Sequence, residues 1–234
     1  MNAPKNQHFV SAVYLRRFCD ADGRIHTYDL EKKEFRSNKP ENVATKKHIY
    51  TITHNGAKDV RIEEFMSEIE TNYGEIIKKI EEGSIEQLDN HDLENIVWFI
   101  SFLYARNLSM VNRFSKISEE LLSFVGNSLL DYNLQQESSA YLRPYLKLST
   151  NPEYTHKMAM DTMFVFAGKM YKLLTSEGNW FFYKAQPDTE FITTDDPMGK
   201  MVMVPLSKNI LFMRVTENIE GLSKSKKVLP ISPE

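Results

Sequence analysis

Apolar residues recur every three or four positions along several segments of this chain, the spacing that places them on one face of an α-helix. The clearest example runs from Val60 to Glu82 and ends at Gly83. Its apolar positions are Ile62, Phe65, Ile69, Tyr73, Ile76 and Ile80. Gly74 lies inside this helix, where glycine costs about 1 kcal/mol relative to alanine. We therefore expect another element to approach the helix closely at Gly74.

The same spacing predicts further helices at 90–106 and 154–176, and helical character resumes at 114–124. Asn90 is an acceptable N-cap for the first of these. A short helix is also expected within Phe9–Phe18 at the start of the chain. The polar stretch 131–151 predicts an irregular connection between helices.

Alternating polar and apolar residues with β-favouring side chains mark short strands before and after the helices. The predicted strands are 24–30, 33–36, 47–53, 180–183, 191–194, 201–205 and 210–215. Segregated strands and helices predict an α+β fold. We expect a single domain over 1–234, with an N-terminal helix and β-region at 1–55, a helical core at 56–178 and C-terminal antiparallel strands at 179–234.

Composition indicates an ordinary globular protein, with 41% hydrophobic and 26% charged residues in 234. The formal net charge of −3 gives no overall basic field to attract nucleic acid or anionic lipid, although a local basic groove stays open. The single cysteine excludes an intramolecular disulfide and a multi-thiolate zinc site, and it favours the cytoplasm. No run approaches the roughly 20 apolar residues that span a bilayer, and no signal sequence is recognisable, so we expect no membrane partner.

Standard catalytic motifs are missing from the sequence: there is no phosphate-binding glycine loop, dinucleotide fingerprint, nucleophile elbow or metalloprotease helix. Their absence disfavours kinases, GTPases and nicotinamide enzymes. Candidate chemistry therefore rests on isolated charged residues. His8, at the entrance of the opening helix, fits a general base; the alternative is a partly buried histidine that bonds backbone groups. Arg16 or Arg17 lies close to the apolar side of the same helix.

Arg106 ends a strongly apolar helix. If its guanidinium turns inward, it must pair with carboxylates or a phosphate. The alternative is a favourable cation at a helix C-terminus, which needs no ligand. Glu63 and Glu70 are seven residues apart and share a helix face, which fits either a divalent-metal site or a solvated acidic face. Asp195 follows a predicted strand, where a carboxylate can ligate metal, act as an acid or simply close a turn.

Short motifs along nearly the whole chain resemble a bacterial family known as domain of unknown function 4238. The matching positions are His8, Tyr14-Leu15-Arg16, Phe18, Ile25–Asp29, Ile69-Glu70, Arg106, Thr193–Pro197 and Val204–Ser207. Asp196 stands where the family usually has asparagine, which leaves Asp195 as the functional acid. The resemblance also leads us to expect a chain that continues past Glu234, so that a final segment is missing or shortened here. It transfers no activity, but it implies that His8, Arg16, Glu70, Arg106 and Asp195 assemble into one site.

Two hypotheses follow for this set. In the first, the protein is a metal-dependent phosphodiester hydrolase, a nuclease of defence or toxin type. His8, Glu70 and Asp195 would be catalytic, Glu70 and Asp195 would bind Mg²⁺ or Mn²⁺, and Arg16 and Arg106 would hold a nucleic acid or nucleotide. In the second, the protein is a non-catalytic binding module whose arginines and carboxylates form a buried ionic network.

Overall fold

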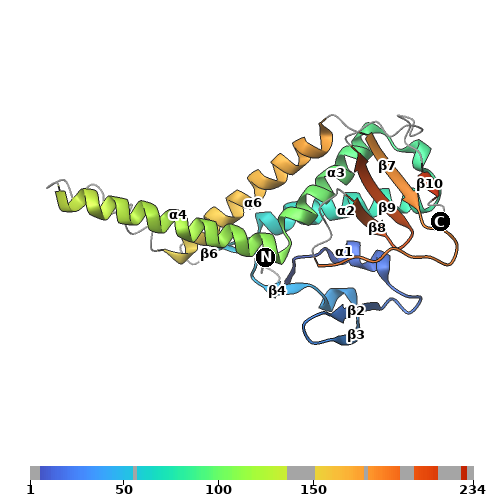
Figure 1. Ribbon diagram of the computed structural model, residues 1–234, viewed down its shortest axis with the longest axis horizontal. Coiled ribbons are helices and arrows are strands. Elements are labelled where there is room, and N and C mark those ends of the chain that lie inside the picture. The colour runs from blue at the N-terminus through green and yellow to red at the C-terminus, as the bar shows by residue number, and fades with distance from the viewer. Residues whose placement is uncertain are drawn as a thin grey trace.

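The computed structural model describes residues 6–54, 57–135, 151–176, 179–195, 203–215 and 228–230. Long helices occupy the middle of the chain, with small β-structures before and after them (Figure 1). The α+β fold predicted from the sequence pattern is therefore confirmed.

The helical part contains α2 (Arg61–Glu81), α3 (Asn90–Ala105), α4 (Leu108–Gln135) and α6 (Pro152–Thr175). The predicted helix at 60–82 matches α2 to within one residue at each end. Asp89, and not Asn90, caps α3, because its carboxylate accepts the backbone N–H of Asp92 at 2.8 Å. Residues 131–135, expected in a connection, belong to α4, and 136–150 lie outside the described residues.

The N-terminal region begins with β1 (Asn6–His8), α1 (Ala12–Leu15) and the 3-10 helix η1 (Arg16–Phe18). Antiparallel pairs join β1 to β4 (Thr45–Lys47), β2 (Ile25–Asp29) to β3 (Glu34–Asn38), and β5 (Ile52–His54) to β6 (Ala57–Asp59). The short 3-10 helices η2 (Pro40–Asn42) and η3 (Ile85–Gln87) complete the connections. The single strand predicted over 47–53 is wrong: His48 adopts a left-handed φ of 53°, which divides the segment into β4 and β5.

A sheet with strand order β10-β7-β9-β8 forms the C-terminal part. Its strands are β7 (Asn179–Lys184), β8 (Met203–Ser207), β9 (Ile210–Val215) and β10 (Val228–Pro230), and only the β10–β7 pairing is parallel. The strand predicted at 191–194 is absent. That segment is held instead by a hydrogen bond from the Phe191 N–H to the Lys208 carbonyl at 2.8 Å.

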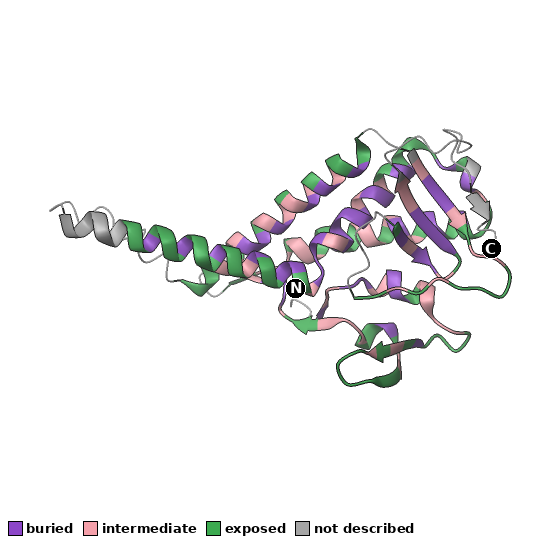
Figure 2. Cartoon of the chain, viewed as in Figure 1, coloured by how far each residue is buried: buried purple, intermediate pink, exposed green. Residues whose placement is uncertain are grey.

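One apolar core joins the opening segment, α2, α3 and the C-terminal sheet (Figure 2). The Tyr73 ring of α2 stacks on Phe99 of α3 with centroids 3.7 Å apart, and its hydroxyl donates to the Leu206 carbonyl. Gly74 lies against α1, since a Cβ at this position would come within 3.2 Å of Val13 Cγ1. The close approach predicted at Gly74 is therefore confirmed, and it seats α1 on α2.

Candidate functional site

Arg106 follows the last residue of α3, and its side chain turns into the protein. α3 is apolar on most of its surface, so the chain buries it between α2 and α6, and its C-terminus lies inside the fold. Asn107 then accepts the Met110 N–H at 2.8 Å and starts α4. Only 5% of the Arg106 side chain is exposed. An unpaired charge at this depth is strongly unfavourable, so the guanidinium requires internal partners.

Glu70, on α2, is the principal partner of Arg106. Its Oε1 accepts from Arg106 Nη1 at 2.6 Å, and 19% of its side chain is exposed. Arg106 Nη2 donates to the backbone carbonyl of His8 at 2.9 Å, and Nη1 also contacts Met66 Sδ at 3.7 Å. Burial alone lowers the pKa of Arg106, but Glu70 and Tyr50 outweigh it and raise the pKa above its ordinary value. The guanidinium therefore links α2, the end of α3 and β1.

Gln7 and Tyr50 extend this link into the N-terminal region. The buried Gln7 side chain accepts the Tyr50 N–H at 2.8 Å and donates to Thr51 Oγ1 at 3.0 Å. The Tyr50 hydroxyl donates to the Arg106 carbonyl at 2.7 Å. Sequence reasoning missed both residues, because a glutamine and a tyrosine carry no motif. We call His8, Tyr50, Glu63, Glu70 and Arg106 the Arg106 cluster.

Glu63 belongs to this cluster through electrostatics. Burial raises the pKa of Glu63, Arg106 lowers it, and the neighbouring Glu70 carboxylate raises it again. Glu63 and Glu70 thus both lie within electrostatic range of Arg106, as their seven-residue spacing on one helix face predicts. A metal site would need more ligands: the described residues include no group of three or more His, Cys, Asp or Glu side chains that could hold a metal ion.

His8 contributes its backbone carbonyl to the cluster and leaves its ring half buried. Burial lowers the pKa of His8, and Arg106 lowers it further, whereas Glu70 and the backbone of Pro40 and Glu41 raise it. Its Nε2 is buried and has no hydrogen-bond partner among the described residues. Burial and the neighbouring guanidinium therefore both disfavour the protonated ring.

Arg16 lies apart from this cluster. Its guanidinium pairs with the Glu41 carboxylate at 2.8 Å, and both side chains are about half exposed. Arg16 lowers the pKa of Glu41. Its neighbour Arg17 bridges to Gly74 and Glu81 of α2.

Asp195 also lies apart, and its side chain is exposed. Among the described residues, no hydrogen bond or ion pair joins Asp195 to His8, Glu70 or Arg106. The segment that precedes Asp195 is held elsewhere, because Thr193 Oγ1 bonds the Tyr14 hydroxyl at 2.7 Å. The structure thus brings together His8, Glu70 and Arg106 of the predicted set, whereas Arg16 pairs with Glu41 and Asp195 is exposed.

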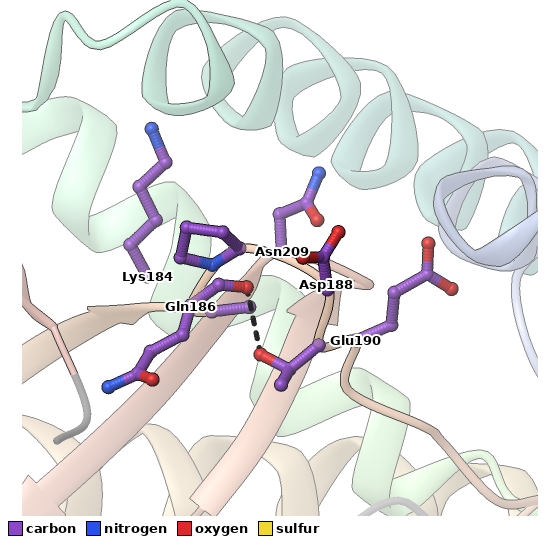
Figure 3. Close-up of a pocket in the computed structure, with 8 residues that line it drawn as sticks. Lys184, Gln186, Asp188, Glu190 and Asn209 are labelled. Carbon is purple, nitrogen blue, oxygen red and sulfur yellow. Dashed lines mark hydrogen bonds between the residues drawn. The ribbon is translucent and has the colours of Figure 1, made fainter. Parts of the chain in front are cut away.

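Two cavities differ in their relation to the Arg106 cluster. The void beside Glu70 and Arg106 is lined mainly by apolar side chains and has no space for a water molecule. A larger hollow, of about 820 Å³, lies at the end of β7 and is lined by 184–190 and Asn209. Lys184, Asp188 and Asn209 border this open hollow (Figure 3). None of the predicted site residues lines it.

The fold and the cluster define an α+β protein in which an arginine–glutamate pair fastens the opening strand to the helices. A family model described as "Protein of unknown function (DUF4238)" matches residues 6–234, and the chain belongs to this family. Comparison with curated proteins and with solved structures found no match. Within the described residues, none of the helices has the length and apolar character that crossing a bilayer requires.

Proposed function

We propose that this protein is a non-catalytic binding module in which the Arg106 cluster stabilises the fold and performs no chemistry. The observation that carries the proposal is the set of partners around Arg106. Its guanidinium bonds Glu70 and the His8 carbonyl, both within the chain, and it is almost wholly buried. A substrate phosphate would have to displace Glu70 from a guanidinium that already holds a charge-assisted hydrogen bond.

The space around the pair supports the same conclusion. Arg106 Nε has no acceptor among the described residues, which would suit an anionic ligand. However, the adjoining void is lined by side chains such as Phe99 and Leu103 and is too small for water. A phosphodiester is far larger than a water molecule. The free donor is therefore shielded by packing and does not form a subsite.

The test combines hydrolysis and stability measurements on the whole chain. Wild type and Asp195→Ala are assayed against single- and double-stranded nucleic acids and nucleotides, with Mg²⁺ or Mn²⁺. We expect no metal-dependent turnover above a no-protein blank, and the same melting temperature for both proteins. Hydrolysis by wild type that Asp195→Ala abolishes, at an unchanged melting temperature, would overturn the proposal in favour of a phosphodiester hydrolase.

We also propose that the module acts in the bacterial cytoplasm. The single cysteine supports this location. A fluorescent fusion that follows the membrane or the periplasm would contradict it.

A further inference from the structure

α4 has one apolar stripe that is already occupied. Its side facing α6 is buried at Val111, Phe114, Ser118 and Leu122. The Phe114 ring packs on Phe166 of α6 with centroids 5.4 Å apart. This stripe explains why the two helices pair.

The apolar face of α4 that includes Phe114 also carries three exposed residues further along the helix. Ile117, Leu121 and Phe124 are 48%, 45% and 69% exposed. Their spacings of four and three continue the register of Met110 and Phe114, which are buried within the chain. Alternating steps of three and four form the apolar seam of a coiled coil, so another α-helix fits this surface. We call Ile117, Leu121 and Phe124 the α4 seam.

The position of α4 leaves this surface accessible. The far end of α4 extends well beyond α2 and α3, and α6 runs along part of its length (Figure 1). Its outer surface is largely exposed over the described part (Figure 2). Within the part of the chain that the structure describes, Ile117, Leu121 and Phe124 are therefore open to a partner helix.

Charges beside the seam favour an antiparallel copy of the same helix. Lys116 and Glu120 lie one turn apart on one flank, 3.8 Å from each other, and both are exposed. With Ile117 of one copy opposite Leu121 of the other, Glu120 of each copy falls within two residues, about 3 Å along the axis, of Lys116 in its partner. In a parallel two-fold pair this flank of each copy lies on opposite sides of the seam, so the Lys116–Glu120 contact between copies is not made. Two-fold antiparallel pairing therefore combines the apolar seam with opposite charges.

We propose that the α4 seam is a self-association surface, on which a second copy of this chain packs its own α4 in antiparallel orientation. This inference rests on the proposed function, because it names one partner of the binding module. The seam is small beside a standard interface of about 1,200–2,000 Å². The dimer is accordingly weak and forms at high protein concentration.

Analytical ultracentrifugation of the full chain, at concentrations up to about 1 mM, tests the proposal across the range of weak dissociation constants. We expect wild type to pass from monomer to dimer. Leu121→Glu places a charge in the seam and should raise the dissociation constant at least about tenfold, a change of about 1.4 kcal/mol. Ser123→Glu, on another face of α4, is the matched control and should leave the dissociation constant unchanged. Circular dichroism verifies that each variant keeps its helix content.

Charge exchange tests the orientation. Lys116→Glu and Glu120→Lys should each weaken self-association, because each sets like charges opposite each other in the antiparallel pair. An equimolar mixture of the two variants should associate again, since every cross-copy pair is then of opposite sign.

Monomeric wild type throughout the concentration range would overturn the inference, as would a dimer that Leu121→Glu leaves intact. Failure of the mixture to recover would overturn the antiparallel arrangement. None of these outcomes affects the hydrolysis assay, so the loss of this inference is distinguishable from the loss of the proposed function.

Discussion

Arg106 Nη1 and Glu70 Oε1 lie 2.6 Å apart across the α2–α3 interface, and the same guanidinium donates to the His8 carbonyl. The ion pair thus does more than join two helices. Through His8 and the adjoining Gln7–Tyr50 contacts it fastens the first strand of the chain to the helical core. The guanidinium thus takes its partners from α2 and β1.

Glu70→Ala should destabilise the protein by about 3 kcal/mol, because it leaves the buried Arg106 charge without its carboxylate. Unfolding in urea, monitored by circular dichroism, measures the change. Glu41→Ala removes the exposed Arg16–Glu41 pair and should change stability by less than about 1 kcal/mol. Equal effects of the two variants would show that the Arg106 cluster is not a structural centre.

Gly74→Ala should destabilise the protein by about 1 kcal/mol, although alanine favours helix by a similar amount. The added Cβ would meet Val13 Cγ1 at 3.2 Å, and a β-branched valine has little freedom to move. Gly168, in α6, has no atom within 4 Å of an added Cβ, so Gly168→Ala should stabilise by about 0.5–1 kcal/mol. Thermal unfolding compares the two variants. Val13→Ala should relieve the effect of Gly74→Ala, and failure to do so would reject the contact as its cause.

Stability should fall as the pH is lowered from about 6.5, because the folded protein holds His8 neutral. Burial is the largest cause of its lowered pKa, and Arg106 adds to it, so the unfolded chain binds the proton first. His156, whose pKa burial also lowers, acts in the same direction. The contribution of these two residues is complete above pH 6.5 and is lost as the pH falls toward their lower folded-state pKa values.

Glu63 affects the pH dependence of stability in the opposite direction. Burial raises its pKa above 4.5, so folding favours its protonated form at more acidic pH. Urea unfolding at a series of pH values between 5 and 8 gives the slope of the free energy of unfolding against pH. Because the two buried histidines contribute to this slope, His8→Asn and His156→Asn should each reduce it. His91→Asn, at an exposed position of α3, is the control. A slope unchanged in both buried-histidine variants would contradict the assignment.

Tyr14→Phe should destabilise the protein by about 1–2 kcal/mol. The Tyr14 hydroxyl donates to the Pro205 carbonyl at 2.7 Å and contacts Thr193 Oγ1 at 2.7 Å, so its removal leaves a carbonyl without its donor. Tyr28→Phe, on the exposed face of β2, should have little effect. Faster hydrogen exchange of β8 amides in Tyr14→Phe would locate the loss, and unchanged exchange there would show that the bond does not anchor β8.

The sequence by itself determined the helices, because an apolar side chain every three or four residues fixes which face of a helix avoids water. It also indicated the close approach at Gly74, since a glycine inside a strong helix needs a local reason. The short strands were less well determined: a single left-handed residue, His48, divides a segment whose alternation reads as one strand.

Only the tertiary structure decided which polar side chains meet. Glu70 and Arg106 are 36 positions apart, and Tyr14 and Thr193 are 179 apart. The packing of α2 and α3 brings the first pair together, while the bond to Tyr14 holds the segment before Asp195 against α1. Burial then determined which partners the Arg106 guanidinium requires. A guanidinium in water is free to bind a ligand, whereas Arg106, removed from water, is stable only with the carboxylate and the carbonyl that the fold places beside it.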